Sequence, residues 1–200
     1  MLTTTLAKIR SYRPCESGWV KLLKHLDKTK PDDVPLSLAT ILKSNGVADT
    51  LWCLRACDGA EMFARYFALD MARRVYPIWH AKHPTNNSVK NCIDVTERFL
   101  SGMASREELQ KARNIYAYAN SAAAYAAYAA AYAAYAADAA DAAYAAYAAY
   151  AADAADAAYA AYANSAAERK WQAKHLAACL KAWPKKPWPN VTPIKVKKDR

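Results

Sequence analysis

Two pairs of carboxylates stand three residues apart in the second half of the chain, Asp138 with Asp141 and Asp153 with Asp156. Residues at this spacing share one side of an α-helix, and paired carboxylates so placed can hold metal ions or hydrolyse a glycosidic bond. No histidine accompanies these aspartates, and their neighbours are all alanine. We therefore interpret them as a solvated helix face.

The cysteines and histidines offer little further chemistry. The five cysteines are odd in number and scattered, which argues against a disulfide framework and favours a reducing cytoplasm. Cys53 and Cys57 would share a helix face, and we interpret them as small buried side chains rather than as a metal or redox pair. His80 and His83 could approach a metal together, but Pro84 indicates a helix end there. Common catalytic and nucleotide-binding motifs are missing, so we expect neither an enzyme nor a cofactor.

Tyrosine is the residue type with the clearest capacity for recognition. Eleven of the 14 tyrosines lie between residues 116 and 162, and tyrosine supplies a large contact area at low entropic cost. These rings either pack against the N-terminal helices with their hydroxyls at the edge or form an exposed strip for another protein. Stacking on nucleobases fits less well, because the segment has no Lys or Arg. The candidate partner-binding residues are Tyr132, Tyr135, Asp138, Asp141, Tyr144, Tyr147, Tyr150, Asp153 and Asp156.

A repeat carries these candidates. From Tyr132 to Tyr162 every third residue is Tyr or Asp, and all the residues between them are Ala. On an α-helix, period three shifts each successive position by about 60°, which places the aspartates on one side and most tyrosines on the other. The repeat therefore predicts an amphipathic helix with an Ala/Tyr face to bury and an Asp face in water.

The helical region around the repeat is too long for one straight helix in a compact molecule. No Pro or Gly occurs from Met103 through Trp183, and Ser105 with Glu108 forms a capping-box motif at its start. One helix of that length would measure roughly 115–120 Å, whereas a compact chain has a radius of gyration of about 16–17 Å. We favour a fold-back near Asn120-Ser121, near Asn164-Ser165, or at both; the alternative is one long helix.

The first hundred residues predict a series of short helices with clear ends. We expect helices over 17–27 and 35–43, one capped by Asp49, one capped by Asp58, and one over 88–102.

The helix after Asp58 has a predicted core stripe and a predicted exposed face. The exposed face would carry the i,i+4 ion pairs Glu61–Arg65 and Asp70–Arg74. The stripe consists of apolar residues at steps of four and three: Phe63, Phe67, Met71, Val75 and Ile78.

Composition and charge narrow the class of protein further. The chain has 200 residues and a formal net charge of +10, and its charged fraction of 23% together with six tryptophans excludes a wholly disordered chain. Asp interrupts the longest apolar stretch, so a membrane span is not expected, and the N-terminus lacks a secretion signal. Residues 164–200 carry ten basic and two acidic side chains, so this end could contact phosphates. The candidate nucleic-acid contacts are Lys185, Lys186, Lys195, Lys197 and Lys198.

Together these patterns predict an all-α helical bundle. Short N-terminal helices (residues 1–104) would pack against long Ala/Tyr-rich helices (105–183) in the same domain. A Pro/Lys-rich extended tail (184–200) would follow.

One motif resembles a family of immunity proteins found in bacteria and their phages. It has the form S-N-G-x-x-D-x-L-W-x-L-R-A and spans Ser44 to Ala56. Weaker similarity covers about residues 35–183, including Thr96–Gly102, an Ala-rich run and Trp171-Gln172; this chain has Tyr where many members have Trp or Arg. The resemblance implies neutralisation of a toxin by binding, with no catalytic residues.

We therefore expect a cytoplasmic, non-enzymatic protein that neutralises a toxin or host-defence effector by direct protein contact. Trp52 and Arg55 would be structural anchors of the motif helix. The alternative is a phage nucleic-acid-associated or virion structural protein that uses the basic C-terminal helix and tail.

Overall fold

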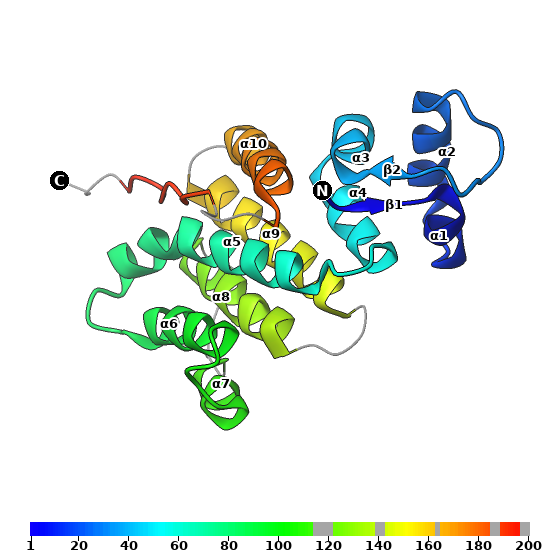
Figure 1. Ribbon diagram of the computed structural model, residues 1–200. Helices are drawn as coiled ribbons and strands as arrows, with labels where there is room; N and C mark the ends of the chain where they lie inside the picture. The colour runs from blue at the N-terminus through cyan, green and yellow to red at the C-terminus, as the bar shows by residue number, and fades with distance from the viewer. Residues whose placement is uncertain (114–121, 139–142, 163–164, 185–188, 197–200) are drawn as a thin grey trace.

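The structure is a computed structural model that describes residues 1–113, 122–138, 143–162, 165–184 and 189–196. It confirms an all-α bundle (Figure 1). The α-helices are α1 (Leu6–Ser11), α2 (Glu16–His25), α3 (Leu38–Asn45), α4 (Val47–Cys53), α5 (Glu61–Lys82), α6 (Ser88–Leu100), α7 (Arg106–Arg113), α8 (Ala122–Asp138), α9 (Ala143–Tyr162) and α10 (Ser165–Ala182), with a 3₁₀ turn at Leu54–Ala56.

Two short strands tie the N-terminus to the start of α3. β1 (Thr3–Thr4) pairs antiparallel with β2 (Leu36–Ser37), so that Thr3 lies opposite Ser37. The helix predicted to begin at Pro35 therefore begins at Leu38, and the Ser37 hydroxyl accepts a hydrogen bond from the backbone N–H of Thr40 at 3.1 Å. Residues 1–60 form the group of short elements at one end of the molecule in Figure 1.

Two predicted helix caps were wrong. α4 begins at Val47, because Gly46 adopts the left-handed φ of 92° that lets a new helix follow α3 directly. Asp49 therefore lies in the first turn of α4 and accepts a hydrogen bond from Asn45 Nδ2 at 2.7 Å. Asp58 does not cap α5 but pairs with Lys8 Nζ at 2.7 Å.

Helix α5 forms the centre of the bundle. It packs mainly against α8 and α9, and Figure 1 shows it crossing the middle of the molecule between α10 and α6. All five residues of the predicted stripe are buried, with at most 2% of each residue exposed. The period of apolar residues in the sequence therefore identified the core face of this helix correctly.

The predicted capping box is confirmed at the start of α7. Ser105 Oγ accepts a hydrogen bond from the backbone N–H of Glu108 at 3.2 Å, and Glu108 Oε2 accepts one from the backbone N–H of Ser105 at 2.7 Å. Two N–H groups that helix formation leaves unpaired are thereby satisfied.

The Ala/Tyr repeat forms two packed helices, so the single long helix is wrong. α8 ends at Asp138 and α9 begins at Ala143, inside the repeat, where the sequence has no Asn-Ser, Gly or Pro. Ring pairs show that the two helices run antiparallel: Tyr132 lies opposite Tyr150 and Tyr135 opposite Tyr147. The expected turns at Asn120-Ser121 and Asn164 lie outside the described residues, although α10 does begin at Ser165.

Alanine fills the interior of this helix pair, and tyrosine lies at its margin. The alanines that are buried on the two helices are Ala126, Ala127, Ala129, Ala130, Ala133, Ala134, Ala136, Ala137, Ala148, Ala151, Ala152, Ala154, Ala155 and Ala158. Among the described tyrosines of the two helices, none is fully buried. The expectation of a buried Ala/Tyr face therefore holds for Ala and only in part for Tyr.

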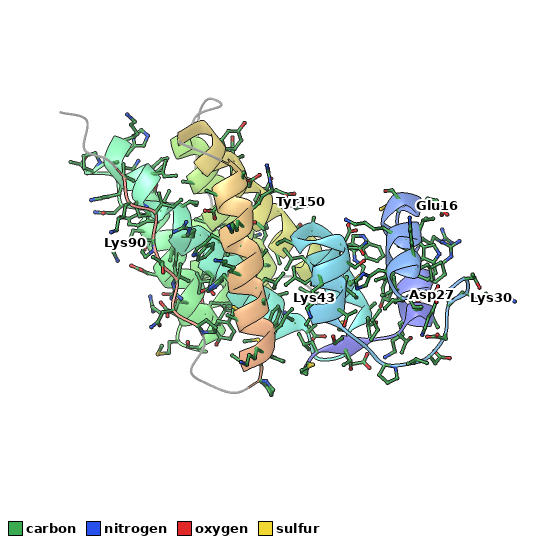
Figure 2. The ribbon with its side chains drawn as sticks, turned by 90° about the horizontal axis from the view of Figure 1, so that it is seen from above. Glu16, Asp27, Lys30, Lys43, Lys90 and Tyr150 are labelled. Atoms are coloured by element: carbon green, nitrogen blue, oxygen red, sulfur yellow. The ribbon has the colours of Figure 1, made fainter. Side chains whose placement is uncertain are left out.

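The C-terminal segment returns to the bundle after α10. Its described part, residues 189–196, lies along α5, and the backbone N–H of Ile194 donates to the carbonyl oxygen of Arg74 at 3.0 Å. Figure 2 shows this segment beside the bundle, on the side away from α1 and α2. None of the helices described above is both long and apolar enough to cross a membrane.

Candidate protein-binding surface

Four tyrosines and one aspartate line a groove between α8 and α9. We call this the tyrosine groove; it consists of Tyr125, Tyr128, Tyr132, Tyr150 and Asp153, with Ala154 and Ala157 in its floor. The spacing explains its formation, because residues three or four apart share one side of a helix on both α8 and α9. Small alanines between them let the two helices approach, which brings the rings of Tyr132 and Tyr150 to 5.5 Å.

Two of these rings are exposed to solvent. Tyr150 is 50% exposed and Tyr128 37% exposed, and both are among the large hydrophobic residues that the described fold leaves in water. Neighbouring rings hold them, since Tyr128 contacts Tyr125 edge-on at 6.2 Å and Tyr150 contacts Tyr147 at 6.3 Å. The groove therefore offers aromatic surface whose rotamers are already restricted, as a binding surface requires.

The groove ends in an acidic pair. Asp153 is exposed, and its pKa is raised, chiefly by desolvation against the helices and secondly by the nearby carboxylate of Asp156. Asp156 is half-buried and binds Arg169 of α10 at 2.9 Å through Oδ2. Its Oδ1 atom is buried and accepts no hydrogen bond from any described residue. At this end of the groove the exposed carboxylate of Asp153 is therefore the group that could meet a hydrogen-bond donor or a cation, whereas Asp156 lines a neighbouring pocket together with Arg169.

Tyr135 and Tyr147 lie beside the groove and are more enclosed. Their rings stack at 5.3 Å, and the guanidinium of Arg113 lies over Tyr135 at 4.5 Å from the ring centre. Both residues are half-buried. Their present contacts are within the molecule, which is the packing role considered for the tyrosines in the sequence.

Several predicted site residues fall outside the description. The side chains of Asp138, Asp141 and Tyr144 lie outside the described part of the structure, as do residues Lys185, Lys186, Lys197 and Lys198. Lys195 is described and exposed, next to the buried Ile194. The structure therefore brings together Tyr132, Tyr150, Asp153 and Asp156 from the predicted set.

A buried polar network holds α10 in place, and the sequence did not reveal it. The predicted exposed pair Asp70–Arg74 is wrong: Asp70 is 1% exposed and contacts His175 of α10, with 2.7 Å between its Oδ2 and the imidazole Nε2. Arg74 instead binds the fully buried Glu168 at 3.1 Å. Because α10 covers this side of α5, polar residues of α10 bind α5 side chains that would face water if α5 were an isolated helix. Because α10 carries many other charged residues, no clear signal in the sequence indicated that Glu168 and His175 would be buried.

The same network connects α10 to α9. Gln172 Nε2 donates to the carbonyl oxygen of Ala152 at 3.0 Å, and Arg74 lies over the ring of Trp171 at 4.3 Å from its centre. Burial raises the pKa of Glu168, although the adjacent guanidinium of Arg74 opposes the shift. These contacts fix the helix that supplies Arg169 to the acidic end of the groove.

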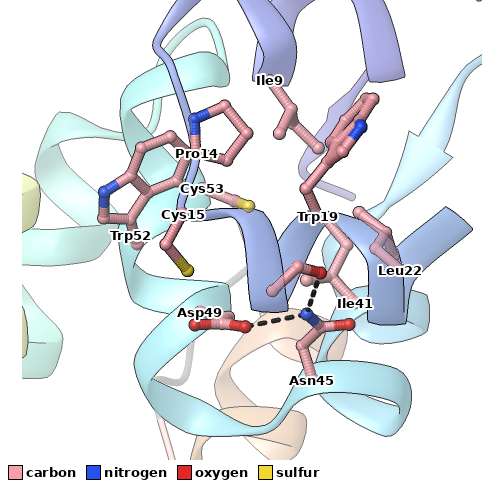
Figure 3. A pocket seen from close by; sticks show the side chains of 11 residues that line it. Ile9, Pro14, Cys15, Trp19, Leu22, Ile41, Asn45, Asp49, Trp52 and Cys53 are labelled. Atoms are coloured by element: carbon pink, nitrogen blue, oxygen red, sulfur yellow. Dashed lines mark hydrogen bonds between the residues drawn. The ribbon is translucent and has the colours of Figure 1, made fainter. Parts of the chain in front are cut away.

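The motif that carried the family resemblance lines a separate apolar cavity in the N-terminal part (Figure 3). The cavity holds about 130 Å³ between the rings of Trp19 and Trp52. Asn45 donates both to the Gly18 carbonyl oxygen at 2.8 Å and to Asp49. A Cβ at Gly18 would lie 2.8 Å from Asp49 Oδ2, so a larger residue there would have to displace the Asp49 carboxylate. The motif therefore organises packing among α2, α3 and α4.

The predicted anchors Trp52 and Arg55 contact each other. The Arg55 guanidinium lies 4.5 Å from the centre of the Trp52 ring, and its Nε donates to the Trp52 carbonyl oxygen at 3.0 Å.

Comparison with known proteins identifies the family. The sequence profile of Immunity protein Imm5 matches residues 56–199, which is most of the chain. The match begins at the last residue of the motif Ser44–Ala56, so it supports the family without confirming the motif itself. No curated protein and no solved structure matches the chain. Because the match covers well over half of its length, the chain belongs to the Imm5 immunity protein family.

Proposed function

We propose that this protein neutralises a toxin by binding it directly, through the tyrosine groove and the acidic residues at its end. The family supports the toxin as the kind of partner. The observation that carries the choice of surface is the exposure of Tyr128 and Tyr150 on the closely packed helices α8 and α9. Clustered, pre-positioned aromatic side chains are the groups that most often dominate the energy of a protein interface.

The surface that we propose keeps the full predicted set. Its described centre is the tyrosine groove, with Tyr135, Tyr147 and Asp156 at its margin. The proposal also keeps Asp138, Asp141 and Tyr144, whose side chains lie outside the described part of the structure. The proposed mechanism is that the bound chain blocks the active surface of the toxin. Blocking that surface needs no catalytic group. A basic or hydrogen-bond-donating side chain of the toxin would meet Asp153, and an apolar segment would meet the rings.

A neutralisation assay tests this proposal. Bacterial toxin domains are co-expressed one at a time with the chain, and the toxin against which it protects is then used to measure the affinity of purified variants. The double change Tyr128→Ala with Tyr150→Ala should weaken binding about 30-fold or more, equivalent to about 2 kcal/mol, and should abolish protection.

Tyr12→Ala is the matched control, because Tyr12 is 45% exposed and follows α1 in the N-terminal part. It should bind and protect as the unchanged chain does. Circular dichroism and thermal unfolding of all variants check that the fold is kept. Full protection by the folded double variant would show that another surface binds the toxin.

A further inference from the structure

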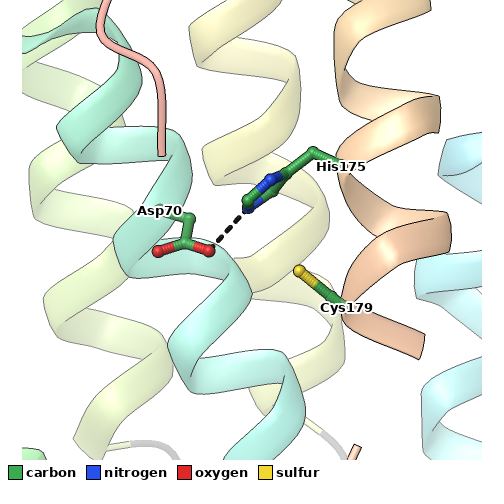
Figure 4. A group of neighbouring side chains, drawn as sticks. All are labelled: Asp70, His175 and Cys179. Atoms are coloured by element: carbon green, nitrogen blue, oxygen red, sulfur yellow. Dashed lines mark hydrogen bonds and ion pairs between the residues drawn. The ribbon is translucent and has the colours of Figure 1, made fainter. Parts of the chain in front are cut away.

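Three chemically different ligand groups converge between α5 and α10. Asp70 lies on α5, and His175 and Cys179 lie four residues apart on α10, on the face turned towards α5 (Figure 4). One carboxylate oxygen, one imidazole nitrogen and the thiol sulfur all lie within 4.8 Å of one another. All three residues are buried, and Cys179 is fully so.

Neighbouring rings fix the orientation of the imidazole. The His175 ring stacks on Trp171 with centres 4.7 Å apart and planes 11° apart, and Phe67 packs near it at 6.1 Å. Nε2 is thereby directed at Asp70, to which it is joined by the 2.7 Å hydrogen bond. An imidazole nitrogen already held against one ligand atom, with the thiol sulfur within 4.8 Å, provides part of the preorganisation that a metal site needs.

We propose that Asp70, His175 and Cys179 form a binding site for a divalent transition metal of the zinc type. Carboxylate, imidazole and thiolate are the three ligand types that Zn²⁺ accepts, at about 2.0–2.3 Å. Tetrahedral coordination at these bond lengths separates ligand atoms by about 3.3–3.6 Å. The observed separations need only small side-chain movements, in which the bond between His175 and Asp70 opens and the sulfur moves inward. A water molecule completes the set, as in other zinc sites with three protein ligands.

Charge balance favours this ion in a dry interior. One divalent cation with one carboxylate, one thiolate and one neutral imidazole has no net charge, which limits the cost of burying the ion. A further charge beside these ligands is the partly exposed guanidinium of Arg73, 3.9 Å from Asp70 Oδ1. Cysteine binds a metal as the thiolate, so the thiol proton of Cys179 must leave when the ion binds. Binding forms the metal–sulfur bond, breaks the S–H bond and releases that proton to solvent.

The ion would fasten α10 to α5. The same two helices are joined by Arg74 and Glu168 two turns earlier on α10, so the metal would supply a second attachment point nearer the C-terminal end of the helix. This site lies inside the bundle and does not depend on the tyrosine groove or on any toxin.

Metal titration of the whole, reduced chain tests the proposal. After removal of metal with a chelator, Co²⁺ is added and the thiolate-to-cobalt absorption is followed; Zn²⁺ should then displace it. We expect saturation at about one equivalent. Cys179→Ser should lose the thiolate absorption, and His175→Gln should weaken Co²⁺ binding at least tenfold.

Cys92→Ser is the matched control, because Cys92 is also fully buried but lies on α6, with its sulfur near the Ala130 carbonyl oxygen. It should keep the absorption and the affinity. Added Zn²⁺ should raise the melting temperature of the unchanged chain and of Cys92→Ser but not of Cys179→Ser.

Two results would overturn the site: absence of thiolate absorption in the unchanged chain, or unchanged absorption in Cys179→Ser. If Cys179→Ser fails to fold, Asp70→Asn provides the decision, because it keeps the size of the side chain and loses its charge. A folded Asp70→Asn that binds Zn²⁺ as tightly as the unchanged chain would equally exclude the site.

Discussion

Glu168 is a fully buried carboxyl whose environment contains one strong opposing charge. Arg74 binds it through two guanidinium nitrogens, at 3.1 and 3.2 Å, and Gln172 lies at 3.5 Å. Desolvation nevertheless dominates and raises the pKa of Glu168 above its ordinary value of 4.5. A carboxyl whose pKa is raised by folding binds its proton more tightly in the native state than in the unfolded state, so it affects stability in a pH-dependent way.

We predict that Glu168→Gln removes a contribution to the free energy of unfolding. In the unchanged chain this contribution becomes smaller as the pH rises. Below pH 4.5 the carboxyl is protonated in both states and its contribution is fully present; as pH rises through the raised pKa, that contribution is lost. The free energy of unfolding of the unchanged chain, minus that of Glu168→Gln, should therefore fall as the pH rises above about 4.5. Urea denaturation at several pH values measures this difference.

Glu107→Gln provides a control of opposite sign. Glu107 lies exposed in the first turn of α7, where its own backbone N–H and the Ser105 hydroxyl lower its pKa. Its contribution is present above its unfolded pKa and is lost as pH falls, so the corresponding difference should grow with pH. A difference for Glu168→Gln that also grows with pH would show that Arg74 outweighs desolvation.

At the scale of elements, α8 and α9 are held together by alanine. Ala133 is fully buried between helices whose residues have almost no side-chain volume to rearrange. Closely packed interiors tolerate extra atoms poorly, because neighbouring side chains must leave their preferred rotamers or the backbone must move. Where alanines meet, few side chains can move aside, so backbone movement is the main response available.

We predict that Ala133→Leu destabilises the fold by about 1–3 kcal/mol, because the added atoms force α8 away from its neighbours. Ala131→Leu on the same helix is the control; Ala131 is only half-buried, and leucine is an equally good helix former there. Urea unfolding measures both. Equal stability of the two variants would mean that α8 and α9 do not pack as closely as described.

The sequence predicted helices well where local signals exist and failed where tertiary contacts decide. The stripe from Phe63 to Ile78 and the capping box at Ser105 depend on local periodicity and hydrogen bonding, and both are confirmed. The break after Asp138 has no local signal, because the repeat is uniform through it. That break follows from the need to bury both alanine-rich segments against α5, which a single helix could not do.

The candidate site was predictable to a similar extent. Spacing alone placed tyrosines and aspartates on sides of a helix, but the groove combines Tyr132 of α8 with Tyr150 of α9, and their pairing depends on the antiparallel fold. The burial of Asp70 was not predictable from α5 alone, because its partner His175 is 105 residues away in sequence. The residue types, tyrosine and aspartate, indicated a recognition surface. The fold of the chain determined which of these residues contact one another.

At the scale of the whole molecule, the C-terminal segment is part of the bundle. Arg74 joins three parts of the chain: its side chain binds Glu168 of α10 and the carbonyl oxygen of Thr192, and its backbone carbonyl oxygen accepts from Ile194. The family match likewise continues to residue 199. The segment after α10 therefore contributes apolar burial against α5 through Ile194, which is 5% exposed.

We predict that Ile194→Ala lowers the free energy of unfolding by about 2 kcal/mol, the lower end of the range for such a change, since a segment near the chain terminus can detach without opening the core. Thr192→Ala keeps the carbonyl oxygen that Arg74 binds and removes only an exposed side chain, so it should change stability by less than about 0.5 kcal/mol. Urea unfolding compares the two. Identical midpoints would contradict a stabilising role, because a segment that packs against α5 through Ile194 must lose stability when that side chain is shortened.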